Sequence, residues 1–210
     1  MKTVTDTLFI NLFGGPGVSK STTAAGVFYR LKSMDINAEL IGEYAKDRTW
    51  GKDSFTLGCQ PYVTAKQLYR QYRVNGQVDI AVTDSPFILG LAYPGFGDTP
   101  SWKAGVIEQF SLFNNVNIFL ERDLEVHKYN PKGRNQTAAQ AQEKDEEIRQ
   151  LLLDEKIPFH SVKVQKDMGT VDEILEIVTN VMFGHTYEEP VKTLVYYDYV
   201  YEGKQKADKV

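Results

Sequence analysis

The sequence has little cysteine, no excess of positive charge and no long apolar run. Its single cysteine, Cys59, excludes a disulfide within the chain and a zinc site built from several cysteines, so a reducing, cytoplasmic setting is expected. The 24 basic and 28 acidic residues give a formal net charge of −4, which argues against a general attraction to nucleic acid or to anionic membranes. No apolar stretch is long enough to cross a bilayer, and no secretion signal is expected near the N-terminus. Any contact with DNA must therefore be local.

Short apolar runs alternate with segments of helical periodicity along most of the 210 residues. The runs predict strands at 8–13, 38–41, 78–83, 115–120 and 159–164. Helices are predicted at 20–33, 61–74, 137–156 and from 170 onward, with further helix starts at Ser85-Pro86 and Thr99-Pro100. This alternation predicts a doubly wound α/β domain with a five-stranded parallel sheet over residues 1–186. Residues 187–210 are rich in β-forming residues and are expected to be a C-terminal extension, partly of β structure and frayed at its end.

Two predicted helices carry a capping-box pattern, in which a hydroxyl residue is followed three residues later by Glu or Gln. The pattern is Thr137 with Gln140 in one helix and Thr170 with Glu173 in the other. We therefore expect reciprocal side-chain to backbone hydrogen bonds at both helix starts.

A glycine-rich segment stands between the first predicted strand and the first predicted helix. It matches the phosphate-loop pattern G-x-x-x-x-G-K-[ST] at Gly14, Lys20 and Ser21, but has Ser19 in place of the second glycine. The alternative, a glycine-rich turn that merely caps a helix, does not explain the lysine. In such loops backbone N–H groups bind phosphates, the lysine contacts β/γ oxygens and the hydroxyl reaches Mg²⁺. We expect ATP to contact Gly14, Gly15, Gly17, Val18, Ser19, Lys20, Ser21 and Thr22, with Ser21 also serving Mg²⁺; Ser19 leaves the nucleotide affinity open.

Asp84 follows the third predicted strand, where a carboxylate can hold the water shell of Mg²⁺. The alternative is a helix-capping or turn aspartate. The next residue is Ser85, whereas motor-type ATPases commonly place there a glutamate that polarises water. This difference favours phosphoryl transfer to an acceptor other than water.

The chain resembles small P-loop kinases of the nucleoside and nucleotide kinase type over residues 7–184. It is also similar to the nicotinamide riboside kinase-like ATP-binding domain and to phage-encoded relatives, through the phosphate loop and three weaker strings at 42–48, 84–86 and 129–137. The resemblance implies a three-layer P-loop NTPase fold with a lid loop, and ATP and Mg²⁺ as cofactors. For a phage-encoded protein it implies the host cytoplasm as the location.

The resemblance also suggests roles for individual residues. Glu43 would lie beside the acceptor and accept its proton, unless it is a solvated glutamate; Asp47 and Asp84 are the other candidates for the base. The stretch 122–135 resembles the lid of these kinases, and a solvated basic loop is the alternative. Within it, the residues expected to contact ATP or the transferring phosphoryl group are Arg122, Lys132 and Arg134.

The helix predicted at 61–74 carries tyrosines at positions 62, 69 and 72, most of which we expect in the core. On its exposed side a tyrosine could stack on a base while Gln67 reads the base edge. Lys66, Arg70 and Arg73 could contact a few phosphates of DNA.

The function expected first is an ATP-dependent kinase with a nucleoside or nucleotide as its small-molecule acceptor. One alternative is a phage kinase that phosphorylates 5-hydroxymethyluracil within DNA, which the resemblance to thymidylate kinase-like DNA kinases allows. A second alternative is an ATP-hydrolysing switch or a nucleotide-binding interaction module. The sequence leaves open the acceptor, the oligomeric state and the role of the C-terminal extension.

Overall fold

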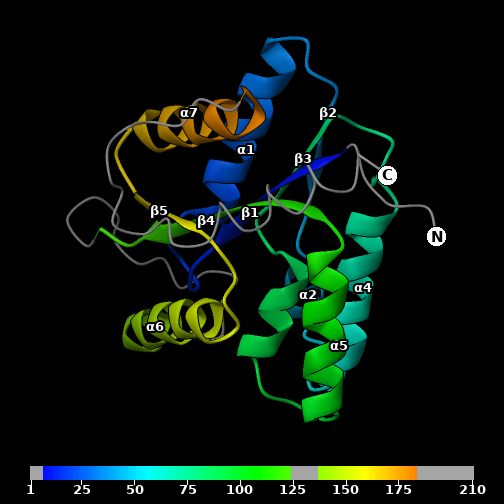
Figure 1. The fold of residues 1–210 in the computed structure, drawn as a ribbon. Coiled ribbons are helices and arrows are strands. Elements are labelled where there is room, and N and C mark those ends of the chain that lie inside the picture. The colour runs from blue at the N-terminus through cyan, green and yellow to red at the C-terminus, as the bar shows by residue number, and fades with distance from the viewer. Residues whose placement is uncertain (1–6, 124–136, 184–210) are drawn as a thin grey trace.

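The computed structural model describes residues 7–123 and 137–183. At their centre lies a five-stranded sheet of order β2-β3-β1-β4-β5, with every neighbouring pair parallel (Figure 1). The strands are β1 (Leu8–Phe13), β2 (Ala38–Ile41), β3 (Ile80–Thr83), β4 (Asn114–Glu121) and β5 (His160–Lys163). The predicted fold class is confirmed, although β3 begins two residues later than expected and β5 is shorter.

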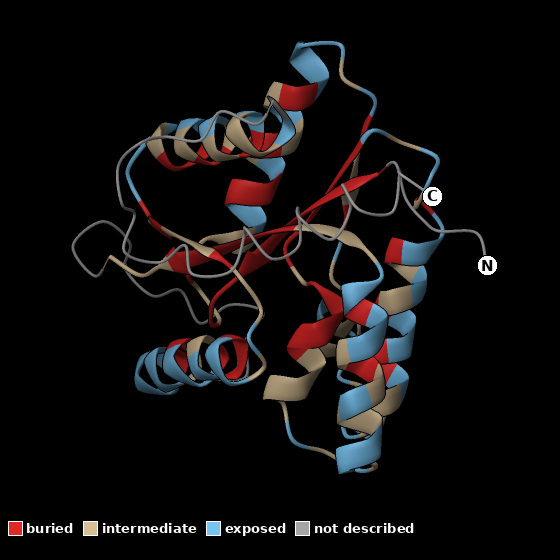
Figure 2. Ribbon diagram, in the orientation of Figure 1, coloured by how far each residue is buried: buried red, intermediate tan, exposed pale blue. Residues whose placement is uncertain are grey.

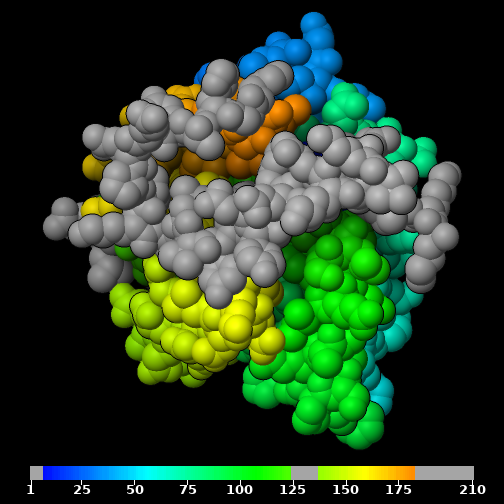
Figure 3. Space-filling model, viewed as in Figure 1, coloured from blue at the N-terminus to red at the C-terminus, as the bar shows by residue number. Residues whose placement is uncertain are grey.

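Helices cover both faces of the sheet and give three layers (Figure 1). One face carries α1 (Lys20–Ser33) and α7 (Gly169–Phe183). The other face carries a 3₁₀ helix and three longer helices, namely η1 (Phe87–Ala92), α4 (Gln60–Tyr72), α5 (Pro100–Ser111) and α6 (Ala138–Asp154). Figure 3 shows α5 (green) and α6 (yellow) as neighbouring parts of the lower surface.

The central strand β1 divides its apolar side chains among three clusters, the smallest of which contains Phe9. Ile10 and Leu12 pack with residues of α1 and α7, whereas Phe13 packs with residues of η1, α5 and α6. All six residues of β1 are buried, as expected for a parallel strand covered on both faces (Figure 2).

Helix starts agree with the sequence at two places. The hydroxyl of Thr99 accepts the Trp102 N–H at the start of α5. At the start of α6, Thr137 Oγ1 accepts the Gln140 N–H and Gln140 Oε1 accepts the Thr137 N–H, which confirms that capping box. These short-range hydrogen bonds depend only on neighbouring residues.

Two helix predictions are wrong in detail. Ser85-Pro86 leads into the 3₁₀ helix η1 instead of an α-helix; there a side chain at Gly90 would collide with Thr64 on α4. The final helix begins at Gly169, so the capping box of Thr170 and Glu173 does not form. Both of their side chains instead accept hydrogen bonds from Gln165.

Two short helices between β2 and α4 were not predicted. They are α2 (Tyr44–Trp50) and α3 (Ser54–Leu57), and neither contains a buried residue. Without a buried face they lack the apolar periodicity that identifies a helix in a sequence.

No helix within the described parts of the chain has both the length and the apolar character needed to cross a membrane. The expected C-terminal extension lies outside the described residues.

Candidate functional site

The predicted site residues come from loops at one edge of the sheet. The phosphate loop follows β1, Glu43 follows β2, Asp84 follows β3 and Arg122 follows β4. Because all strands are parallel, their carboxyl ends lie at the same edge, which is where α/β sheets bind ligands.

The phosphate loop ends at the start of α1 with Ser19 in the left-handed region, at φ 68° and ψ 15°. This geometry explains the glycine that the phosphate-loop pattern has here, since a side chain in this conformation costs about 1–2 kcal/mol. The Ser19 side chain makes no capping hydrogen bond to the first turn of α1. The N–H groups of that turn therefore remain suited to an anion.

Lys20 folds back onto the loop that precedes it. Its Nζ donates hydrogen bonds to the carbonyl oxygens of Gly14 (2.6 Å) and Gly15 (2.8 Å). Burial lowers the pKa of Lys20, and the negative charges of Glu43 and Asp84 oppose that shift. The lysine thus lies near both carboxylates named as candidates for acid–base chemistry.

A buried ion pair holds the first part of the phosphate loop. Asp145, on α6, accepts the Gly15 N–H through Oδ1 at 2.5 Å and pairs through Oδ2 with Arg122 Nε at 2.7 Å. Arg122 also donates to the Pro16 carbonyl oxygen at 2.9 Å. We call Arg122 and Asp145 the loop clamp; their side chains are 10% and 11% exposed.

The loop clamp requires α6 to lie very close to the loop backbone. A Cβ at Gly15 would lie 2.5 Å from the Ala141 carbonyl oxygen and 2.7 Å from Asp145 Oδ1. Gly15 is therefore needed for this close contact. Sequence reasoning named Arg122 and Gly15 but missed Asp145, which is 130 residues from Gly15 in the chain.

Two carboxylates of the site are partly or fully removed from water, since Asp84 is buried and Glu43 is half-buried. Burial raises the pKa of Glu43, and Lys20 opposes this shift. Burial also raises the pKa of Asp84, again opposed by Lys20. Although Glu43 is the N-cap residue of α2, its side chain makes no capping hydrogen bond.

Asp84 fits the role expected of a group beside Mg²⁺. Its Oδ1 is buried without a hydrogen-bond partner, which a cation or a water of its shell would provide. Ser21 lies in the first turn of α1 with an exposed side chain. The described residues contain no cluster of three or more His, Cys, Asp or Glu placed to hold a metal by themselves.

Tyr93, which follows η1, is a further residue of the site that the sequence analysis did not name. Burial raises its pKa, and the charges of Glu43 and Asp145 add to the effect. Lys144 Nζ lies 4.9 Å from the ring centroid and donates to the Ala92 carbonyl oxygen at 2.8 Å. Tyr93 is therefore near enough to Glu43 and Asp145 for both charges to affect it; an isolated tyrosine in a Gly/Pro-rich turn gives no sequence signal of this.

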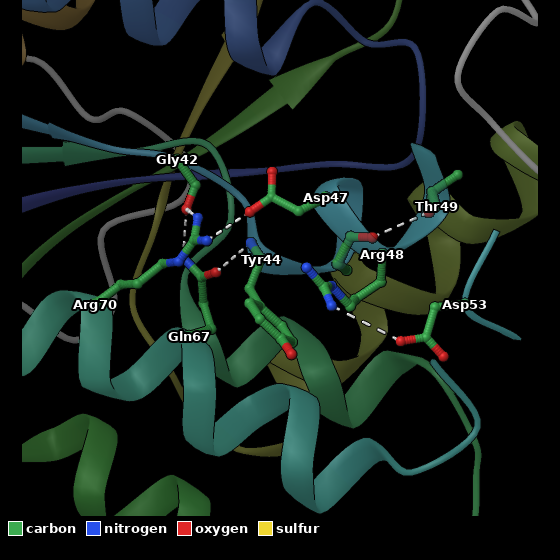
Figure 4. A network of polar contacts seen from close by, with 9 residues as sticks. Gly42, Tyr44, Asp47, Arg48, Thr49, Asp53, Gln67 and Arg70 are labelled. Atoms are coloured by element: carbon green, nitrogen blue, oxygen red, sulfur yellow. Dashed lines mark hydrogen bonds and ion pairs between the residues drawn. The ribbon is translucent and has the colours of Figure 1, made fainter. Parts of the chain in front are cut away.

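The segment after β2 is held by α4 through polar contacts (Figure 4). Gln67 Oε1 accepts the Tyr44 N–H at 2.8 Å, while Gln67 Nε2 and Arg70 Nη1 donate to the Gly42 carbonyl oxygen. Arg70 also pairs with Asp47 at 2.6 Å. We call this set the acceptor-side network.

Two expectations for the side chains of α4 are wrong, one for Gln67 and one for the tyrosines. Gln67 is 4% exposed and holds backbone groups, so it is not free to read the edge of a base. The tyrosines expected in the core are exposed, with 45% exposure for Tyr62, 63% for Tyr69 and 65% for Tyr72. The residues of α4 that face inward include its polar side chains Thr64, Gln67 and Gln71.

Near the acceptor-side network, Arg48 Nη1 pairs with Asp53 Oδ2 at 3.8 Å. The other lid residues expected at the site, Lys132 and Arg134, lie outside the described residues.

No protein-family model and no curated protein matches this sequence. Among solved structures, the chain is similar to a cysteine-to-alanine mutant of the APS kinase CysC from Mycobacterium tuberculosis. The identity is 10% and the TM-score 0.42, and the match covers 85% of this chain and 99% of the other. A likeness at this level carries no functional assignment, so the case for a function depends on the site itself.

Proposed function

We propose that the protein is an ATP- and Mg²⁺-dependent kinase that transfers the γ-phosphoryl group to a hydroxyl or phosphate of a nucleoside or nucleotide. The observation that carries the proposal is the grouping of Lys20 with Glu43 and Asp84 beside a loop of phosphate-binding pattern. A positive charge and two shielded carboxylates are what phosphoryl transfer needs for charge stabilisation, metal binding and proton acceptance.

Each residue has a distinct role in this proposal. The first turn of α1 and Lys20 hold the phosphates, Ser21 and Asp84 serve Mg²⁺, and the loop clamp fixes the loop backbone. Bound Mg²⁺ would neutralise charge on the β- and γ-phosphate oxygens. Glu43 accepts the proton of the acceptor hydroxyl as the new O–P bond forms and the bond to the ADP leaving group breaks.

Transfer is favoured over hydrolysis because Ser85 occupies the position after Asp84. Its N–H donates to Thr83 Oγ1 at 3.1 Å within the turn. Its side chain is a hydroxyl, which is a poor base for activating water compared with a carboxylate.

The test is product analysis with γ-labelled ATP and Mg²⁺ against a panel of acceptors. The panel contains free nucleosides, free nucleotides, and DNA with 5-hydroxymethyluracil, which is the alternative acceptor from the sequence resemblance. Label in a free nucleoside or nucleotide is the expected result. Label only in the modified DNA would move the acceptor to that alternative, free phosphate alone would indicate a hydrolysing switch, and ATP binding without turnover would indicate an interaction module.

A further inference from the structure

The outer face of α4 carries an alternating stripe of aromatic and basic side chains. Tyr62, Lys66, Tyr69 and Arg73 recur at spacings of four, three and four residues, so they lie within about 60° of one another around the helix. All four are exposed, and Tyr72 extends the aromatic surface beside them. We call these five residues the α4 stripe.

The α4 stripe has an uncompensated positive charge in a protein whose net charge is negative. Among the described residues, neither Lys66 nor Arg73 has an ion-pair partner. The helix sequence itself contains no Asp or Glu. The neighbouring carboxylate of Asp47 is neutralised by Arg70, which turns toward Gly42 (Figure 4).

Ring contacts join the α4 stripe to the segment that follows β2. Tyr44 directly follows Glu43, and its ring lies 6.2 Å from that of Tyr62 in an edge-on arrangement. Lys66 Nζ lies 5.3 Å from the Tyr62 ring centroid. The stripe therefore begins at the acceptor side of the site and continues along α4 for about 16 Å.

We propose that the α4 stripe is a binding surface for single-stranded nucleic acid. Exposed tyrosine rings provide stacking surfaces for bases, which every base can use, and the intervening cations contact the phosphates between them. Pairing with a second copy of α4 fits less well, because Lys66 and Arg73 would be buried against a helix without any carboxylate. This inference goes beyond the proposed kinase activity and does not depend on it.

The first test measures the binding of the full chain to a fluorescein-labelled 15-nucleotide oligothymidylate by anisotropy at 50 mM salt. Tyr69→Ala should weaken binding by about fivefold or more, whereas Tyr69→Phe, which keeps the ring, should retain it. Tyr29→Ala is the matched control, since Tyr29 lies on α1 and is 67% exposed. An oligouridylate of equal length shows whether DNA or RNA is preferred, and tight binding of either strand supports the proposal.

The second test measures the salt dependence of the same binding. Lys66→Gln and Arg73→Gln should each reduce the slope of log K against log[salt] by about 0.7, because each removes one phosphate contact. Lys32→Gln, an exposed cation on α1, should leave the slope unchanged. Circular dichroism of every variant separates a local effect from unfolding.

Several results would overturn the proposal. They are no binding of either oligonucleotide at 50 mM salt, equal weakening by the α1 control variants, and preference for duplex over single strand. A dimer that Tyr69→Ala converts to a monomer, without any change in oligonucleotide binding, would assign the surface to a second copy. Lys20→Ala should bind the oligonucleotide like the unmodified protein, so failure of the kinase proposal is distinguishable from failure of this one.

Discussion

Two ion pairs of similar length stabilise opposite sides of the candidate site. Arg122–Asp145, at 2.7 Å, holds the phosphate loop, and Arg70–Asp47, at 2.6 Å, belongs to the acceptor-side network. Their environments differ: the side chains of the first pair are 10% and 11% exposed, those of the second 30% and 51%. The N···O distances are nearly equal, but burial predicts that losing one partner of the Arg122–Asp145 pair costs more stability.

The two ion pairs therefore contribute unequally to stability. Breaking a buried pair leaves a charge without solvent, which typically costs 3–5 kcal/mol, while an exposed pair contributes about 0–1 kcal/mol. The Arg122–Asp145 pair is therefore a strong constraint on the loop backbone. On the other side the Arg70–Asp47 pair adds little, and the hydrogen bonds of the buried Gln67 to Tyr44 and Gly42 hold the segment after β2.

The largest effect is expected from Lys20→Ala on the phosphate-loop side. Removing this charge should lower phosphoryl transfer by about 10³–10⁵-fold, because charge gathers on the phosphoryl group in the transition state. The measurement is the transfer rate with γ-labelled ATP, with circular dichroism as the control for folding. Turnover near that of the unmodified protein would remove Lys20 from the mechanism.

Glu43→Gln tests the acceptor side and should lower turnover by about 10²–10⁴-fold with little change in ATP affinity. Because burial raises the pKa of Glu43, the carboxylate takes up a proton at a pH above its ordinary value of 4.5. The rate of the unmodified protein should fall as pH is lowered through that raised value, and Glu43→Gln should lack this step. If Glu43→Gln keeps its turnover while Asp84→Asn loses it by this factor, the base is Asp84 and not Glu43.

The loop clamp is tested by Asp145→Asn, which leaves Arg122 buried without its counter-charge. We expect the free energy of unfolding to fall by about 3–5 kcal/mol in urea titrations. The double variant with Arg122→Gln should recover part of that loss, because no unpaired charge then remains. If the double variant loses as much free energy of unfolding as Asp145→Asn and Arg122→Gln lose together, the two side chains do not act as a pair.

Asp84→Asn should lower the rate of phosphoryl transfer and raise the free energy of unfolding. Burial raises the pKa of Asp84, so the folded protein binds this proton more tightly than the unfolded chain does. The stabilisation that follows is complete below the ordinary pKa of 3.8 and is lost as pH rises through the folded value. At pH 7 the asparagine variant should therefore be more stable by about 1 kcal/mol in urea titrations, while transferring little phosphate; a less stable variant would contradict this.

The smallest effect is expected from Asp47→Asn in the exposed pair. The free energy of unfolding should change by less than about 1 kcal/mol, since water screens both charges. A loss as large as that of Asp145→Asn would contradict the conclusion that burial, and not distance, decides how much each pair contributes to stability.

Sequence reasoning succeeded where structure is decided by neighbouring residues. The bounds of β1, α1 and β2 were predicted as observed, because an apolar run, a glycine-rich loop and a helical period follow one another directly. The capping box of Thr137 and Gln140 is equally local. Prediction from the sequence failed for α2 and α3, which bury no face. It also failed for the tyrosines of α4, whose aromatic character suggested the core but which are exposed.

The five strands, the longer helices between them, the glycine-rich loop after β1 and the carboxylates that follow β2 and β3 could be found from the sequence, since each is a pattern within a few residues. The spatial order of the strands and the contacts that hold these parts follow only from the tertiary structure. Asp145 meets Gly15 across 130 residues, and Gln67 meets Tyr44 across 23. A hydrogen bond between distant residues depends on how α6 and α4 pack against the sheet edge, and no local pattern encodes that distance.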